Sequence, residues 1–147
     1  MKSDLMLEGR VFEMSKWHLK GCGDRYFIKV IFMNEFELFT MIYFALDAFY
    51  GTKIEDVFIC TVISDMNPFI WSDIGSADPA MYSEYIDFLN GRTITIDNSL
   101  DIAKEYLETI DYADVTDALK DVTTEEWSSY CRKYLAEPHK GGEAREE

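Results

Sequence analysis

The residues from which metal centres and disulfide frameworks are built are scarce in this chain. It has two histidines, His18 and His139, and three cysteines, Cys22, Cys60 and Cys131, whose spacing fits no zinc-binding or disulfide pattern. The odd number of cysteines and the apolar run around Cys60, VFICTVI, favour a reducing, cytoplasmic setting with a buried thiol. The sequence therefore predicts no metal and no other cofactor.

Motifs for nucleotide, phosphate or hydrolytic chemistry are also missing. The chain contains no P-loop, no dinucleotide-binding glycine fingerprint, no G-x-S-x-G elbow and no HExxH pair. Residues 73–84 begin and end with the acids of a calcium loop, but Gly75 and Ala77 replace oxygen ligands, and Asp78 stands where the loop needs glycine. We therefore expect a protein that is not an enzyme.

Long apolar runs are missing as well. The most apolar stretch runs from Leu38 to Leu46, whereas a helix that crosses a bilayer needs about 20 apolar residues. Asp4, Glu8 and Arg10 interrupt the region where a secretory signal would be apolar. Together with the cysteine usage, these features predict a cytoplasmic protein that makes no contact with membranes.

One short stretch, WHLKGCGDRYFIKV at residues 17–30, gathers His18, Cys22 and Asp24 within seven positions. A zinc site would need a second close Cys/His pair, which the chain does not offer. A Cys–His nucleophile is the other reactive alternative. The two glycines within residues 20–24 instead favour a hairpin loop between two strands, and this is the interpretation we prefer.

Apolar periodicity predicts an α+β fold with a small, mainly antiparallel sheet packed against helices. One domain is expected over residues 1–136, with a sheet-containing part at 1–96, an acidic helical part at 97–136 and a flexible polar tail at 137–147. About four strands are expected, at residues 5–19, 25–33, 54–63 and 92–96. The C-terminal third is expected to be helical, at about 99–112, 114–121 and 124–136.

Several helix ends are marked by capping residues. Asn34 and Glu37 form a capping-box pattern before a helix that Gly51 ends. Its apolar stripe, which runs from Phe36 to Phe49 at spacings of three and four residues, is expected to face the sheet. Asp78 followed by Pro79 marks the start of a second helix, which Asn90 and Gly91 end. In the last predicted helix, Thr123 and Glu126 form another capping box, followed by an apolar stripe that includes Trp127, Tyr130 and Cys131.

Basic side chains are few in this chain relative to acidic ones. There are 28 acidic and 14 basic side chains, which gives a net charge of −14. Such a charge repels nucleic acid, so we expect no direct contact with DNA or RNA. Six bases and four acids lie within residues 1–33, so the acidity belongs to everything that follows.

Between Asp97 and Glu126, ten acids accompany only two bases, Lys104 and Lys120. Spacings of three and four residues place successive acids on one side of a helix, where they destabilise it by a few tenths of a kcal/mol per pair. One interpretation is the solvated face of amphipathic helices. We favour a row that binds cations of another protein, comprising Asp97, Asp101, Glu105, Glu108, Asp111, Asp114, Asp117 and Asp121, with Tyr112, Phe69 and Trp71 as further contacts.

Three functional classes follow from this charge pattern. The leading hypothesis is a non-enzymatic inhibitor that blocks a basic, nucleic-acid-binding surface of a nuclease or other effector, as DNA mimics and anti-CRISPR proteins of phages and mobile elements do. The alternative is an immunity protein that neutralises a cognate toxin through a tailored patch, with Phe69 to Trp71 as its contacts. A hydrolase built on Asp73 and the neighbouring aromatics is a third class, and it requires a concave pocket with a carboxylate of raised pKa.

Overall fold

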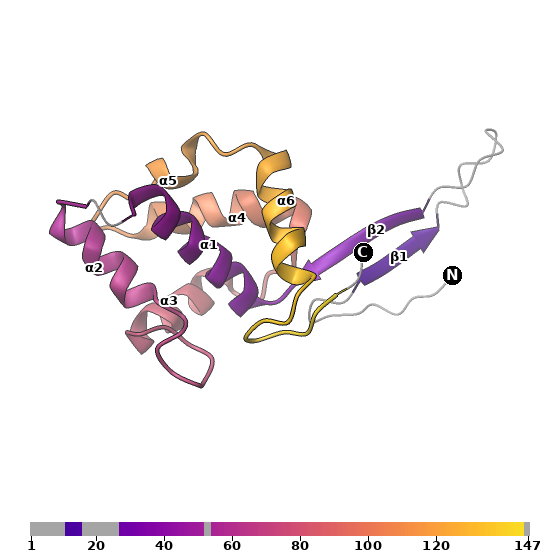
Figure 1. Ribbon diagram of the computed structural model, residues 1–147, viewed down its shortest axis with the longest axis horizontal. Helices are drawn as coiled ribbons and strands as arrows, with labels where there is room; N and C mark the ends of the chain where they lie inside the picture. The colour runs from indigo at the N-terminus through magenta and orange to yellow at the C-terminus, as the bar shows by residue number, and fades with distance from the viewer. Residues whose placement is uncertain (1–10, 16–26, 52–53, 146–147) are drawn as a thin grey trace.

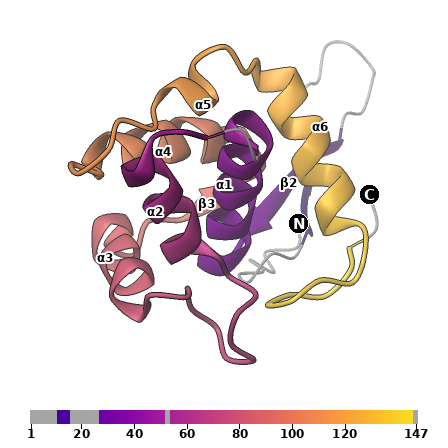
Figure 2. The ribbon, with the colours of Figure 1, turned by 60° about the vertical axis from the view of Figure 1, so that its left-hand side comes forward.

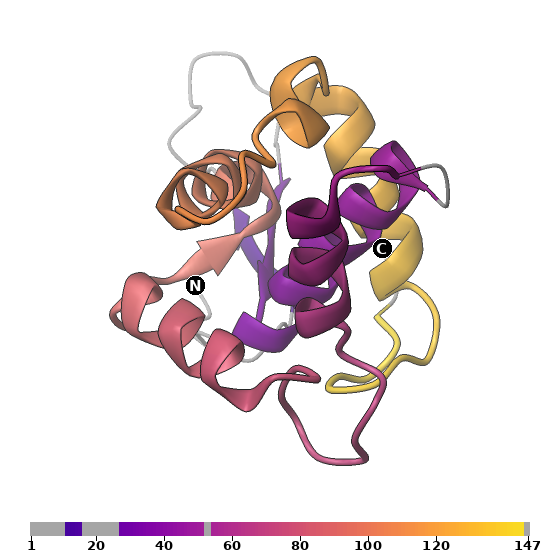
Figure 3. The same cartoon turned by 90° about the vertical axis from the view of Figure 1, so that its left-hand side faces the viewer.

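The computed structural model describes residues 11–15, 27–51 and 54–145, and it combines a small antiparallel sheet with a mainly helical body (Figure 1). In chain order the elements are β1 (Val11–Ser15), β2 (Phe27–Met33), α1 (Glu35–Tyr50), α2 (Val57–Met66), α3 (Pro79–Leu89), β3 (Ile94–Thr95), α4 (Ile96–Thr109), α5 (Asp117–Lys120) and α6 (Thr124–Leu135). Figure 3 shows α3, α4 and α6 arranged around α1 and α2. Among the described helices, none combines the length and the apolarity needed to cross a membrane.

The sheet is smaller than the sequence predicts. Strands β1 and β2 pair in antiparallel fashion, with Val11 opposite Ile31, and β3 adds a short pairing in which Ile94 lies opposite Met33. Buried Met33 and Ile94 tie this end of the sheet to the helical core. The described residues therefore hold three strands in place of the expected four. The expected hairpin loop, with His18 and Cys22, lies outside the described residues.

The predicted strand at 54–63 is wrong, because this segment forms α2. The Asp56 side chain accepts hydrogen bonds from the N–H groups of Phe58 and Ile59, which satisfies two donors at the helix start. The buried Val62 and Met66 recur at helical spacing, whereas Phe58 is 59% exposed. The β-branched composition favoured a strand, but packing one face of a helix against the core overrode that propensity.

Helix α1 begins and ends where its capping residues predict. Asn34 and Glu37 exchange backbone-to-side-chain hydrogen bonds of 2.9 and 2.7 Å, and Gly51 ends the helix with a positive φ of 62°. All residues from 36 to 42 are buried, so α1 is covered on every side in its first half. Phe49, predicted to lie on its buried face, is instead 56% exposed.

The other capping signals are confirmed, although α4 and α5 differ from their predicted bounds. Asp78 caps α3, which ends at the left-handed Asn90, and Thr123 caps α6. Helix α4 begins earlier than expected because Thr95, within a predicted strand, acts as its N-cap. The helix then ends at Thr109, and α5 has a single turn.

Helix α6 is fastened to α4 by a buried hydrogen bond. The Trp127 indole N–H donates to Ser99 Oγ at 2.7 Å, and Ser99 itself donates to the backbone carbonyl of Ile96. Burial raises the pKa of the neighbouring Cys131 thiol to about 12. Cys60, predicted to be a buried thiol, is only half-buried, because its segment is a surface helix.

The segment after α6, for which the sequence predicts a flexible tail, makes specific contacts up to Arg145. Arg145 Nη2 donates to both carboxylate oxygens of Glu37, at 2.6 Å to Oε1, and His139 Nε2 lies 2.6 Å from Glu37 Oε2. The other ring nitrogen of His139 lies 2.7 Å from the carbonyl oxygen of Glu137. Glu37 is completely buried, so its charge is neutralised by residues more than 100 positions away.

This arrangement predicts a large cost for neutralising Glu37. The substitution Glu37→Gln keeps the volume and the oxygen that caps α1, but leaves Arg145 buried without its counter-ion. We expect the free energy of unfolding to fall by about 3–5 kcal/mol in urea titrations. Glu35→Gln, on the same helical turn, is the matched control, and equal losses in the two variants would contradict the role of the ion pair.

Candidate functional site

The acids of α4 are all exposed, as the predicted binding row requires. Asp97, Asp101, Glu105 and Glu108 fall within an arc of about 80° at 100° per residue, so they share one side of the helix. Among the described residues, Glu105 is the member of this set that has a basic partner, with Arg92 Nη1 at 3.0 Å from its Oε1. The remaining three project carboxylates without an ion pair inside the described part of the chain.

The two bases of the acidic segment lie together beside this row. Lys104 and Lys120 line a shallow hollow of about 270 Å³ between α4 and α5, together with Glu108. Neither lysine comes within 4 Å of a carboxylate of the described residues. They reduce the net negative charge at the Glu108 end of the row.

The row does not continue in a straight line beyond α4. After Thr109 the chain turns and passes over α5 to α6 (Figures 1 and 2), so Asp114, Asp117 and Asp121 lie on a different segment from the acids of α4. Asp114 accepts hydrogen bonds from the backbone N–H and the hydroxyl of Thr116, which lower the pKa of its carboxyl. The one-sided row predicted across residues 97–121 is therefore limited to the acids of α4, at positions 97–108.

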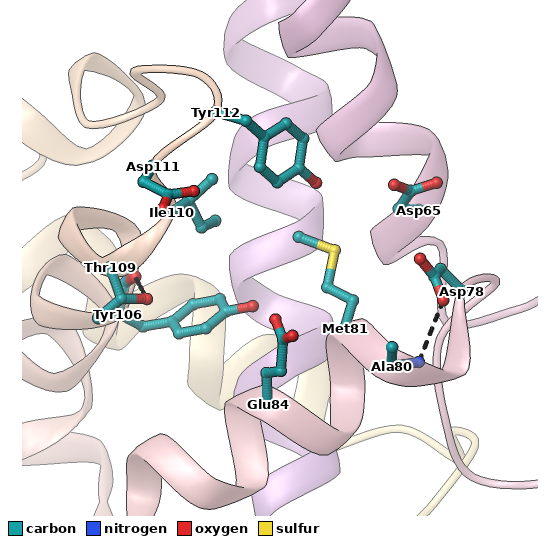
Figure 4. A pocket seen from close by; sticks show the side chains of 10 residues that line it. All are labelled: Asp65, Asp78, Ala80, Met81, Glu84, Tyr106, Thr109, Ile110, Asp111 and Tyr112. Atoms are coloured by element: carbon teal, nitrogen blue, oxygen red, sulfur yellow. Dashed lines mark hydrogen bonds between the residues drawn. The ribbon is translucent and has the colours of Figure 1, made fainter.

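Asp111 and Tyr112, two members of the predicted row, instead line a pocket of about 270 Å³ beside the end of α4. This acidic pocket, shown in Figure 4, brings together carboxylates from three parts of the chain and two tyrosine hydroxyls. Its polar side chains are Asp65, Asp78, Glu84, Asp111, Tyr106, Tyr112 and Thr109.

Local structure explains how these side chains converge. Asp65 lies in the last turn of α2, and its carbonyl oxygen accepts a 3.0 Å hydrogen bond from the backbone N–H of Asp78, which joins α2 to the start of α3. The Asp78 carboxylate caps α3 by accepting from Ala80 N–H at 3.1 Å. Glu84 follows on α3, and the hydroxyl of Tyr106 from α4 points towards it (Figure 4).

Several groups of the acidic pocket have raised pKa values. Burial, and then the charge of Asp78, raises the pKa of the Asp65 carboxyl, while a hydrogen bond with Tyr112 acts in the opposite direction. Burial also raises the pKa of the Tyr112 hydroxyl, followed by the charges of Asp65, Asp78, Glu84 and Asp111. A guanidinium or ammonium group placed here would relieve this repulsion.

The acidic pocket differs from a metal centre and meets only one of the requirements of the hydrolase class. Within the described residues, no three His, Cys, Asp or Glu side chains are grouped so that they could hold a metal ion. The hydrolase class required a pocket with a carboxylate of raised pKa, and Asp65 provides one. However, Asp73, the acid predicted for that role, is exposed on the 67–78 loop and does not line this pocket.

The predicted aromatic contacts lie outside the acidic pocket. Phe69 is 48% exposed and stacks on Phe44 of α1, with ring centroids 5.8 Å apart. Trp71 is 52% exposed, and its indole N–H donates to the carbonyl oxygen of Ala77 at 3.2 Å. The structure thus divides the predicted site into the α4 row, the acidic pocket, the acids around α5 and this aromatic loop.

Sequence reasoning missed three acids and one tyrosine of the acidic pocket: Asp65, Asp78, Glu84 and Tyr106. Asp78 was recognised as a helix cap, but nothing in its pattern indicates that it also faces a cavity. Asp65 was missed because residues 54–63 were predicted to form a strand that ends before it, whereas the helix α2 includes it. Helical periodicity at Ile59, Val62, Ile63 and Met66 is the signal that could have placed it.

No protein-family model matches the chain, and neither a curated protein nor a solved structure is significantly similar to it. The functional argument therefore starts from the side chains described above.

The raised pKa of Asp65 predicts a pH-dependent gain in stability when its charge is removed. A raised carboxyl pKa means that the folded state binds the proton more tightly, so stability is lost as pH rises through the pKa. Asp65→Asn should therefore raise the Tm by about 1–3 °C at pH 7 and bring no gain near pH 3 in thermal melts. Asp73→Asn, which removes an exposed carboxylate outside the pocket, is the control, and an equal gain there would refute the assignment.

Proposed function

We propose that this protein is a non-enzymatic, cytoplasmic inhibitor that occupies a basic, nucleic-acid-binding surface on another protein. The observation that carries the proposal is the exposed row of carboxylates on α4, three of which have no basic partner among the described residues. The proposed partner is a nuclease or another nucleic-acid-binding effector. Such inhibitors are typical of phages and mobile elements, where DNA mimics and anti-CRISPR proteins act in this way.

The spacing of the row supports this choice of partner. Acids three or four residues apart on a helix are separated by about 4.5–6 Å along its axis. Phosphates follow one another every 3.4 Å along one strand of DNA. Lysines and arginines arranged to track a phosphate backbone would therefore meet several carboxylates of α4 at once.

The acidic pocket supports the proposal independently of the row. Asp65, Asp78, Glu84 and Asp111 line a pocket of about 270 Å³. There the charge of Asp78 acts against that of Asp65, and all four charges disfavour ionisation of Tyr112. One lysine or arginine side chain of the partner would supply a cation, and a bidentate arginine would satisfy two carboxylates. A net charge of −14 would also accelerate the encounter with a basic protein.

A solvated helical face explains the same acids less completely. Hydration alone requires polar residues and sets no preference for one sign of charge. Interleaved bases would have stabilised α4, whereas Asp97 and Asp101 remain without an ion pair among the described residues. The repulsion between Asp78 and Asp65 in the acidic pocket adds a free-energy cost that a solvated face does not need.

An immunity protein that neutralises a cognate toxin is the second candidate. The stacked and exposed Phe44 and Phe69 favour it, because a tailored apolar patch is suited to one particular partner. Reversal of the α4 charges would impair the first function and would leave a mainly apolar interface nearly intact.

Charge reversal tests the proposed function directly. The protein is coupled to beads and mixed at low salt with a bacterial lysate from which nucleic acid has been removed. Each basic protein recovered is then bound to labelled DNA, and displacement of the DNA is followed by fluorescence anisotropy. The triple variant with Asp101→Lys, Glu108→Lys and Asp111→Lys should displace DNA about 100-fold more weakly than the parent protein. Displacement by the parent protein should itself weaken as the salt concentration rises.

A matched variant separates the row from the overall charge. Glu55→Lys, Asp73→Lys and Glu143→Lys change three exposed acids elsewhere and alter the net charge equally. We expect the ability of this control variant to displace DNA to fall by less than about tenfold. Failure to recover any basic protein, equal losses in the two triple variants, or undisturbed DNA binding by the recovered proteins would each refute the proposal.

A further inference from the structure

An apolar groove is lined by residues of α1, α5 and α6. The arrangement of these three helices can be followed in Figures 1 and 2. The groove has a volume of about 610 Å³ and is separate from the acidic pocket, with which it shares no lining residue. We define the α1–α6 groove by six of its lining residues: Phe44, Ala45, Ala48 and Phe49 of α1, Leu119 of α5 and Tyr130 of α6.

Two aromatic side chains that line the groove are exposed to solvent. Phe49 is 56% and Tyr130 58% exposed, although their apolar spacing predicted buried positions. Phe44 stacks on Phe69 and meets Tyr134 edge-to-face at a centroid distance of 5.6 Å, so one wall continues into the aromatic loop. Clefts of this size that are lined mainly by apolar and aromatic side chains are typical of binding sites.

Carboxylates lie near the end of the groove at which α5 begins, because Asp117 directly precedes the lining residues Ala118 and Leu119. Burial raises the pKa of the Tyr50 hydroxyl, followed by the nearby charges of Asp117, Asp114 and Asp56, which places these acids around the C-terminal end of α1. The last turn of α1 contains no base, so the partial negative charge of its terminal carbonyls adds to theirs. Lys133 and Glu137 are the charged residues that line the groove itself.

We infer that the α1–α6 groove binds a short amphipathic helix of the basic partner, with lysine or arginine at the end that meets Asp114 and Asp117. This inference rests on the proposed function and adds an apolar anchor to it. Met41, Ala45 and Ala48 line the groove at helical spacing, which gives it a length of about 10 Å, or two turns of a bound helix. The small Ala45 and Ala48 leave room for the apolar side chains of that helix.

Charge favours a basic partner over a second copy of the chain. Two copies of the chain, each of net charge −14, would repel one another when they approach. A helix whose polar face is basic would gain from the same charges.

The test uses fluorescein-labelled peptides of about 15 residues, the length at which isolated helices become stable. The first has leucine at helical spacing and lysine elsewhere, and the second has the same composition in scrambled order. A third replaces the lysines with glutamate. We expect the first peptide to bind at least about tenfold tighter than the second, and to keep that ratio at about 1 M salt, where the Debye length is about 3 Å. The third should bind more weakly than the first.

Variants of exposed side chains locate the binding site. Phe49→Ser with Tyr130→Ser should reduce the affinity for the first peptide to that for the scrambled one, and Ala48→Trp, which fills the groove, should do the same. Phe58→Ser is the control, because Phe58 is 59% exposed on α2 and does not line the groove. Circular dichroism of each variant confirms that it is folded.

Four outcomes would overturn the inference: equal affinity for the striped and scrambled peptides, binding of the glutamate peptide as tight as that of the lysine peptide, an equal effect of Phe58→Ser, or self-association that Phe49→Ser abolishes. If the Phe49→Ser, Tyr130→Ser variant displaces DNA from a basic partner as well as the parent protein does, the proposed function stands and the groove inference fails. If the peptides are discriminated but no partner releases DNA, the groove inference stands and the proposed function fails.

Discussion

The buried carboxylate of Glu37 is the interaction on which the rest of the structure depends. Its oxygens cap the first turn of α1, accept from Arg145 and lie against His139, so the start of the central helix and the C-terminal segment are held together at one point. A completely buried charge is tolerated only when it is neutralised and hydrogen-bonded. The position of α1 therefore depends on a segment more than 100 residues away, and α1 in turn forms one wall of the apolar groove.

This central position of α1 accounts for the two contrasting surfaces of the molecule. The first half of α1 is enclosed by the core, whereas its second half exposes Phe49 beside α5 and α6. The exposed charges of α4, by contrast, are mostly carboxylates: Asp97, Asp101, Glu105 and Glu108, with Lys104 as the one base of the helix. An acidic row combined with an apolar groove is suited to a partner whose surface is both basic and amphipathic, because charge accelerates the encounter and apolar contacts slow dissociation.

Local signals predicted the parts of the fold that short segments control. The bounds of α1 and the starts of α3 and α6 followed from Asn34, Asp78 and Thr123, because a cap and its partner lie within three residues of one another. The prediction for 54–63 was wrong because its β-branched residues were weighed by propensity, while burial of Val62 and Met66 decided the outcome. The acidic pocket could not be predicted, because Asp65 and Asp111 come from separate elements.

The sequence by itself determined the excess of acid, the capped helix ends and the absence of the common catalytic motifs, because each depends on composition or on neighbours a few positions apart. Only the tertiary structure decided which acids share a helix face, which meet in a pocket and which aromatics remain exposed. The physical reason is that electrostatic repulsion and apolar burial depend on distance in space, and the turn after Thr109 and the anchoring of Arg145 on Glu37 set those distances.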